Sequence, residues 1–498
     1  MSPVFVLTMI VVSYSPILYP NLLAPMSGSQ GSIIYVPWEY DSINEAIENA
    51  APGTLIIVKA GEYIEDISIE RKSNIVLKGE GKVIISTDNR GLTLLNIKFS
   101  YNITVENLVF NGYGRDYTRY GVIHIEDSDT IAINNNVFLE KINGIVALDI
   151  RFSENIVFSG NNVSGFTGLR GSSFNGLTIY NNTFNVETLV SISRVNNTYI
   201  YFNEIHGDPA IYIGPYSNVE WSSPRKIVYG FNDQVFMSRI GNYWEDWVIG
   251  YNIGDRDNNG ICDARYNTKY GFDNYPLKYP LKTYALLKPF IEITQPSEQE
   301  LVSGEIVVSF KPYIPDLDKV VVKLNNSEYI VRGANQVRLN TLNYSDGYYQ
   351  LTVLGFDKDN ERYSDEIHVY IDNTPPIIKS LYIDNENGRE PIIRWVVVED
   401  YIDTQQLFIN NTLLMESSNT TSYILDTSNL APGKYVIILK VIDKTGHITT
   451  ANTTYEKIIE NTTKTSEYDD LSRIILLSLI IVTGVAMLSI FFLSKRTR

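Results

Sequence analysis

One loop carries residues whose types and spacing could bind a metal ion. Residues 254–263 read GDRDNNGICD, so oxygen-bearing side chains recur at alternate positions before a glycine. Alternate oxygen ligands, with a glycine for the sharp turn, are how EF-hand loops bind calcium. The expected ligands are Asp255, Asp257, Asn259, the backbone carbonyl of Ile261 and Asp263, with Asp273 of the following FDNYPL segment as a further carboxylate.

The loop departs from an EF-hand at its twelfth position, where Tyr266 stands in place of a bidentate glutamate. Loops rich in Asp, Asn and Gly are also common without a metal, since these residues favour turns. A calcium site and a solvated acidic loop are therefore the two interpretations.

A second set of polar residues lies on segments that read as strands. The most plausible catalytic pair is Asp149 with Arg151, near His124 and Glu126. Cleaving or modifying a polysaccharide needs a carboxylate pair, or a base beside a cation. These residues match no recognisable catalytic motif, so the sequence favours a solvated strand face over a catalytic site, and a protein that is not an enzyme.

The elements that must position these residues repeat. Between residues 103 and 206 the chain reads ITVENLVF, IAINNNVF, IVFSGNNVS, LTIYNNTF and YIYFNEIH. In each unit a strand with period-two apolar alternation runs into a turn. The turn asparagines are Asn107, Asn135, Asn161, Asn181 and Asn203. Units of about 20–29 residues predict a solenoid. In it, the side chains of stacked asparagines would hydrogen-bond to one another, and the asparagines would adopt the left-handed backbone of the turn. An antiparallel sandwich is the alternative.

The start of the solenoid is also predicted. Ser42 and Glu45 form a capping box, and Ile43, Ala46 and Ile47 share one face of a short helix. Such a helix would cover the open end of the stack, which otherwise exposes strand edges.

Residues 41–69 resemble the start of the pectate-lyase-like right-handed parallel β-helix. GNYWEDW at 241–247, GDRDNNGICD at 254–263 and FDNYPL at 272–277 resemble the NosD-type β-helix of archaeal surface proteins, and the likeness spans residues 32–281. That family is labelled copper-binding. Copper prefers imidazole and sulfur ligands, whereas the four histidines and the single cysteine here are scattered, so copper is not carried over.

Two similar modules follow, at 286–372 and 373–458. SDGYYQLTVLGFDKDN in the first matches APGKYVIILKVIDKTG in the second, and DNTPP at 372–376 joins them. Short strands at regular spacing predict an immunoglobulin-like β-sandwich for each, with Trp395 in the core of the second.

The ends predict the location. Residues 474–493 form an uncharged apolar run long enough to span a membrane, after a linker at 459–473. The tail at 494–498 is basic, which places it in the cytoplasm and the rest outside. Residues 1–28 read as a signal peptide, with a retained N-terminal anchor as the alternative.

The composition agrees with a surface location. A net charge of −16 and the absence of a basic stripe exclude nucleic acid as a partner, and one cysteine permits no internal disulfide. We expect an all-β chain: a right-handed parallel β-helix, two Ig-like β-sandwich modules and one C-terminal transmembrane helix. Its expected role is structural, or binding of surface glycans or envelope proteins. The alternatives are a polysaccharide-modifying enzyme of the lyase, glycosidase or epimerase class, and an envelope metal-handling protein.

Overall fold

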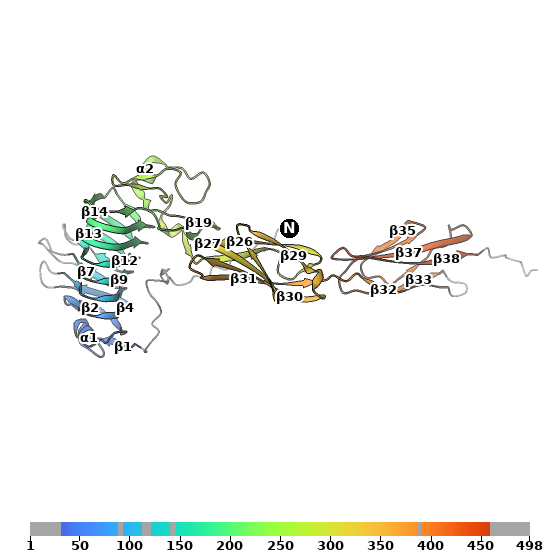
Figure 1. The fold of residues 1–498 in the computed structure, drawn as a ribbon, viewed down its shortest axis with the longest axis horizontal. Coiled ribbons are helices and arrows are strands. Elements are labelled where there is room, and N and C mark those ends of the chain that lie inside the picture. The colour runs from blue at the N-terminus through green and yellow to red at the C-terminus, as the bar shows by residue number, and fades with distance from the viewer. Residues whose placement is uncertain (1–30, 88–92, 112–120, 140–145, 386–389, 459–498) are drawn as a thin grey trace, which may run out of the picture. The chain divides into compact units, whose positions relative to one another are not determined.

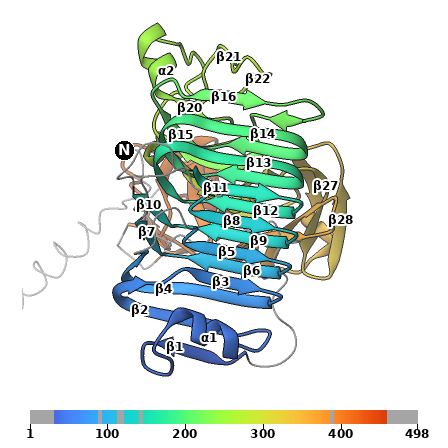
Figure 2. The same cartoon turned by 90° about the vertical axis from the view of Figure 1, so that its left-hand side faces the viewer.

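The computed structural model describes residues 31–87, 93–111, 121–139, 146–385 and 390–458. Eighteen strands between residues 33 and 244 form one continuous hydrogen-bonded network, and every pairing within it is parallel. They build a β-solenoid of about eight turns, which confirms the predicted parallel β-helix and excludes the antiparallel sandwich. Figure 2 shows the turns stacked one above another.

Each turn contributes to three faces. The first sheet contains β3 (Ile67–Glu70), β5 (Leu95–Lys98), β8 (Ile123–Glu126), β11 (Val146–Arg151) and β16 (Ala210–Ile213). The second contains β1 (Ile33–Val36), β6 (Tyr101–Glu106), β9 (Asp129–Asn134), β12 (Glu154–Ser159) and β17 (Val219–Glu220). The third contains β7 (Val109–Asn111), β10 (Val137–Leu139), β15 (Glu204–His206) and β20 (Tyr243–Trp244).

Four long strands pass through more than one face. These are β2 (Leu55–Ile64), β4 (Ser73–Ser86), β13 (Asn162–Tyr180) and β14 (Thr183–Tyr201). The repeated phrases of the sequence pair in register, because Ile103 lies beside Ile131 and Ile131 beside Ile156.

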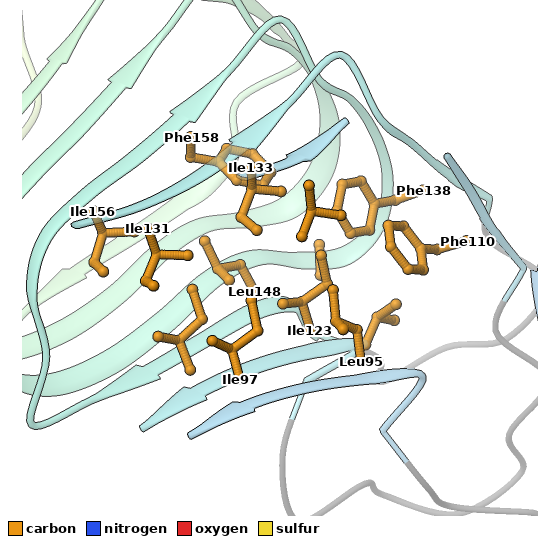
Figure 3. Packing of buried hydrophobic residues seen from close by; sticks show 14 of the residues in the cluster. Leu95, Ile97, Phe110, Ile123, Ile131, Ile133, Phe138, Leu148, Ile156 and Phe158 are labelled. Atoms are coloured by element: carbon orange, nitrogen blue, oxygen red, sulfur yellow. The ribbon is translucent and has the colours of Figure 1, made fainter. Parts of the chain in front are cut away.

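Apolar side chains fill the interior of the solenoid in columns, one residue from each turn (Figure 3). Ile97, Ile123 and Leu148 are fully buried. Phe110 and Phe138 stack with ring centroids 5.3 Å apart. Like residues therefore lie on like residues, which is why the period-two alternation recurs at the same place in each turn.

A helix covers the first turn, as expected. α1 (Ile43–Asn49) begins at Ser42, whose hydroxyl accepts a hydrogen bond from the Glu45 N–H at 3.0 Å. Ile43, Ala46 and Ile47 are buried against the core. In Figure 2 the helix lies at the β1 end of the stack, where it shields the apolar interior.

The asparagine turns differ from the prediction in one respect. The residue that adopts the left-handed backbone is not the residue whose side chain joins the hydrogen-bonded stack. The two are consecutive in the chain. Asn107, Asn135 and Asn181 adopt positive φ, and Gly160 and Phe202 take the same place in the other turns. The next residue along the chain is the one that stacks, because its side chain points inward. Asn161 and Asn203 therefore belong to the buried stack and not to the left-handed column.

This buried stack, the asparagine ladder, consists of Asn136, Asn161, Asn182, Asn203 and Asn242. In the first four, the backbone N–H donates to the side-chain oxygen of the asparagine one turn on, at 2.8 to 3.2 Å. Their Nδ2 groups also donate to backbone carbonyls, as Asn182 does to Phe158 at 2.9 Å. Buried amide groups are thus satisfied, as an apolar interior requires.

The last part of this domain is less regular. α2 (Glu245–Tyr251) follows β20, and the strands β18 (Ile227–Phe231), β19 (Gln234–Ser238) and β23 (Ala285–Leu287) form an antiparallel sheet. The short strands β21 (Tyr266–Asn267) and β22 (Phe272–Asp273) pair as a hairpin. Tyr229, Phe231 and Tyr284 pack in a second core here.

The two following modules are antiparallel β-sandwiches, apart from one short parallel pairing in the first. The first pairs β24 (Phe290–Gln295), β26 (Glu305–Tyr313) and β29 (Gln336–Asn340) in one sheet. Its other sheet contains β25 (Glu300–Val302), β27 (Leu317–Leu324), β28 (Ser327–Val331), β30 (Gly347–Asp357) and β31 (Arg362–Ile371).

The second module pairs β32 (Ile377–Asp384), β33 (Ile392–Val398) and β36 (Ser422–Ile424). Its other sheet contains β34 (Ile402–Ile409), β35 (Thr412–Ser417), β37 (Gly433–Asp443) and β38 (Ile448–Lys457) (Figure 1). Trp395 is buried in the core, as predicted, and its Nε1–H donates to Gln405.

By contact density the chain divides into two compact units. Among the described residues, one comprises those from 31 to 295 with 308–337 and 351–366, and the other comprises 296–307, 338–350 and those from 367 to 458. Within the described ranges no helix combines the length and the apolar character needed to cross a bilayer. The predicted signal peptide, linker, membrane helix and tail lie outside those ranges.

Candidate functional site

The predicted calcium loop forms a turn held by its own side chains. The Asp255 carboxylate accepts the N–H groups of Asn259 and Gly260 at 3.1 and 2.9 Å. The amide of Asn259 donates to Asp257, and its oxygen accepts from the Ile261 N–H. Burial and the neighbouring Asp257 raise the pKa of Asp255. The loop therefore concentrates negative charge on a folded turn.

The remaining predicted ligands have other partners. Asp263 accepts from the Arg256 N–H at 3.2 Å. Asp273 is fully buried, and its Oδ2 accepts the Asn242 N–H at 2.7 Å and the Trp244 Nε1–H at 3.0 Å. Burial raises the pKa of Asp273 to about 7 against the opposing effect of these bonds. The structure thus makes Asp273 the last acceptor of the asparagine ladder, a role that differs from the predicted one.

Cys262 lies within this loop and packs inward. Its side chain is buried in the second core with Tyr229 and Tyr284. Burial raises the pKa of the thiol to about 12, so the reactive thiolate is suppressed.

The predicted pair Asp149 and Arg151 belongs to a larger polar cluster on the outer side of the first sheet. The parallel register places His124, Asp149 and Arg170 in one column across β8, β11 and β13. Lys98, Glu126 and Arg151 form the adjacent column. Since neighbouring strands lie about 4.8 Å apart, side chains of successive turns reach one another directly.

The cluster is organised around Asp149. Its Oδ2 lies 2.9 Å from His124 Nδ1 and 3.2 Å from Arg151 Nε, and its Oδ1 lies 2.7 Å from Arg170 Nε. Asp149 and His124 are at most 1% exposed. The prediction of a solvated strand face is therefore wrong for these two residues, which are buried and paired inside the cluster.

The electrostatics follow from these contacts. Burial favours the protonated form of Asp149, but the hydrogen bonds from His124 and Arg170 outweigh it, so the pKa of Asp149 is lowered. The hydrogen bond from Lys98 likewise lowers the pKa of Glu126. Both carboxylates are therefore ionised at neutral pH.

An open hollow of about 480 Å³ adjoins this cluster, at the turns that lead from the first sheet to the second. We call it the turn groove. Its lining residues are Phe99, Ser100, Tyr101, Asp127, Ser128, Asp129, Phe152 and Glu154. Ser100 and Ser128 form its buried floor, where the Ser100 N–H donates to the Ser128 hydroxyl at 3.1 Å.

The walls of the turn groove are two columns of side chains. Phe99, Asp127 and Phe152 occupy the same position of three successive turns, all with φ near +50°. Tyr101, Asp129 and Glu154 pair in register along the other wall. Phe99, Tyr101 and Phe152 are 50%, 53% and 59% exposed. The groove thus offers flat aromatic rings beside carboxylates.

The aromatic residues are not explained by the fold. Asparagine and glycine adopt the left-handed backbone conformation at low energetic cost, whereas a bulky residue in that conformation is unfavourable. Phe99 and Phe152 carry this cost and are half exposed to water, and the Arg71 guanidinium lies 5.1 Å from the centroid of the Phe99 ring. Such an arrangement points to a surface that a ligand covers.

Sequence reasoning missed Phe99, Phe152 and Arg170, and it named His124 only as a residue near the predicted pair. The sequence signal that could have found them was the spacing between them, because residues of one column are separated by the length of the solenoid turns. Because that length changes between turns, columns cannot be aligned until the strand register is known.

Comparisons with known proteins identify no family. No family model matches the chain, and no curated protein matches it. Among solved structures, the fibronectin(III)-like modules of Clostridium thermocellum CbhA are 15% identical, with a TM-score of 0.24 over 34% of this chain and 93% of theirs.

A 1.5-MDa bacterial ice-binding adhesin is 16% identical, with a TM-score of 0.23 over 34% of this chain and 63% of that one. A tetra-tandem repeat of a large adhesion protein is 10% identical, with a TM-score of 0.20 over 48% and 68%. At these scores the likeness carries no argument about function.

Proposed function

We propose that the protein is a cell-surface binding protein that holds a glycan in the turn groove of its solenoid. The single observation that carries this is the row of exposed aromatic rings set beside carboxylates. Apolar faces of sugar rings stack on aromatic rings, and carboxylates accept hydrogen bonds from sugar hydroxyls.

The charge of the groove selects the class of glycan. Asp127, Asp129 and Glu154 lie in it, and the whole chain carries a net charge of −16. Like charges repel, so a polyanionic glycan is disfavoured and a neutral or amino-sugar glycan is favoured. Phe99 and Phe152 lie two turns apart, about 9.6 Å at about 4.8 Å per turn, which suits an extended chain running along the solenoid axis.

The test is glycan binding by the purified protein. Neutral and amino-sugar polysaccharides should bind, and Phe99→Ala with Phe152→Ala should weaken the affinity at least tenfold without lowering the Tm. The matched control is Tyr251→Ala, because Tyr251 at the end of α2 is 75% exposed and lies outside the groove. Equal binding by the double variant and the control would refute the groove as the site.

The proposed location supports this role. Residues 474–493 would anchor the chain in the membrane, the tail at 494–498 would lie in the cytoplasm, and the β-sandwich modules would act as spacers that display the solenoid outside. Envelope proteins are the other class of partner that such a display suits.

A second candidate function is modification of a polysaccharide. The observation in its favour is the cluster of His124, Asp149, Arg151 and Arg170, which combines a base with cations beside the groove. A base that removes a proton next to a sugar carboxylate uses such cations to stabilise the resulting charge. Against this, His124 and Asp149 are buried and already paired with one another.

A further inference from the structure

A group of metal-ligating side chains lies far along the sequence from the calcium loop. Asp372 follows β31, Asp443 ends β37, and His447 lies in the turn before β38. One carboxylate oxygen from each aspartate and one imidazole nitrogen all lie within 4.8 Å of one another. All three residues belong to the same compact unit.

Asp372 has an unsatisfied charge that points to a missing partner. The residue is 5% exposed, and its Oδ2 is buried without a hydrogen-bond donor. The carboxylates of Glu399, Asp443 and Asp346 add like charge around it. A buried carboxylate oxygen without a donor and among other carboxylates is costly, and a bound cation would satisfy it.

The hydrogen bonds around His447 decide which ring nitrogen faces the group. Asn373 is fixed by its Nδ2, which donates to the Thr341 carbonyl at 2.8 Å, so its Oδ1 accepts from the Ser303 hydroxyl at 3.1 Å. Ser303 then accepts from His447 Nε2 at 3.1 Å. This leaves His447 Nδ1, which faces Asp443 Oδ2 at 2.9 Å and the Thr445 hydroxyl at 2.8 Å, as the ring nitrogen that takes a proton or a metal ion.

The equivalent turn of the first module shows which features of the Asp443 turn are specific to the second module. Asp357 accepts the N–H groups of Asp359 and Glu361, just as Asp443 accepts those of Thr445 and His447. In both modules the aspartate therefore stabilises the turn by accepting its backbone N–H groups. Only the second module has a histidine at the later position and a buried aspartate beside it.

We propose that Asp372, Asp443 and His447 bind a divalent transition-metal ion of the zinc class, with water as the fourth ligand. One imidazole and two carboxylates suit zinc, whereas calcium prefers six to eight oxygens. Tetrahedral bonds of about 2.0 Å separate ligand atoms by about 3.3 Å, so atoms within 4.8 Å need only a small closure. The ion would tie Asp372 to the turn between β37 and β38.

The experiment uses the full chain, stripped of metal with a chelator and then titrated with zinc in competition with a chromophoric chelator. Zinc should bind and raise the Tm, and both Asp372→Asn and His447→Gln should lose one equivalent of zinc together with that rise. His368→Gln and His206→Gln are matched controls, because those histidines pair with glutamates elsewhere and should leave this equivalent in place.

The metal-free Asp372→Asn variant separates loss of binding from loss of fold. Replacing a crowded buried carboxylate by an amide should leave its metal-free Tm equal to that of the parent or higher. Equal zinc stoichiometry in the parent and Asp372→Asn would overturn the proposal. So would a Tm rise that calcium but not zinc produces and that Asp372→Asn abolishes.

Discussion

His124 Nδ1 lies 2.9 Å from Asp149 Oδ2, and both side chains are buried on adjacent turns of the solenoid. This contact joins residues that are 25 positions apart, because each turn of the chain returns to the same face. Arg170, one turn further, completes the charge balance at Asp149. The cluster therefore ties three successive turns together, whatever it does chemically.

The first prediction concerns the pH dependence of stability. The pKa of Asp149 is lowered in the folded protein, so its contribution is present above the ordinary pKa of about 4 and is lost as the pH falls through the folded value. Asp149→Asn should lower the free energy of unfolding at pH 7, and the gap between variant and parent should narrow toward pH 3. Urea titrations at several pH values measure this, with the exposed Glu48→Gln as control. A gap that is the same at pH 7 and pH 3 would contradict the prediction.

The second prediction separates the two asparagine columns. Asn182 is fully buried and donates to Phe158 and Asn203, so Asn182→Ala leaves several buried groups without partners. It should lower the free energy of unfolding by about 3 kcal/mol or more, since each such group costs about 1–3 kcal/mol.

The matched control for the ladder is the preceding residue. Asn181 has φ of +57°, a conformation that glycine adopts freely, so Asn181→Gly should change stability by no more than about 0.5 kcal/mol. Chemical denaturation of both variants gives the comparison. Similar losses in the two would mean that the ladder is not the stabilising column.

The third prediction concerns calcium at residues 255–263. A ligand that binds only the folded state stabilises it by about 2.7 kcal/mol at a hundredfold excess over its Kd. Calcium should therefore raise the Tm over that in chelator, and Asp255→Ala with Asp257→Ala should abolish the rise. Asp372→Asn should leave it unchanged, which separates this loop from the zinc-class site. Equal melting with calcium and with chelator would refute calcium binding by the loop.

The fourth prediction is that the purified protein releases neither reducing ends nor unsaturated sugars from acidic or neutral polysaccharides. The reason is that Asp149, from the most plausible catalytic pair, is buried and paired with the buried His124. Turnover that disappears in Arg151→Ala, while glycan binding persists, would instead assign the protein to the enzyme class.

The fifth prediction concerns the membrane. A chain that ends before residue 474 should stay in solution, whereas the full chain should require detergent, because the apolar run at 474–493 is expected to be its sole anchor. Membrane fractionation with a high-salt wash compares the two. Retention of the shorter chain on membranes would show a second attachment.

The sequence by itself determined the repeating architecture. Period-two alternation, the spacing of the turns and the Ser42 cap are local signals, and each predicts its element without knowledge of the rest of the chain. The two sandwich modules and the buried Trp395 were predicted for the same reason. The calcium loop remains a local motif whose ligands have protein partners in the structure.

Tertiary structure alone decided which residues meet. Whether Asn161 lies in the turn or in the ladder depends on which neighbour takes the positive φ, here Gly160. Asp273 became the end of the ladder because the chain returns to bury it beside Asn242, and no local pattern encodes that return. Likewise, His124 meets Asp149, and Phe99 shares a column with Phe152, only through the register of parallel strands, which varying turn lengths conceal in the sequence.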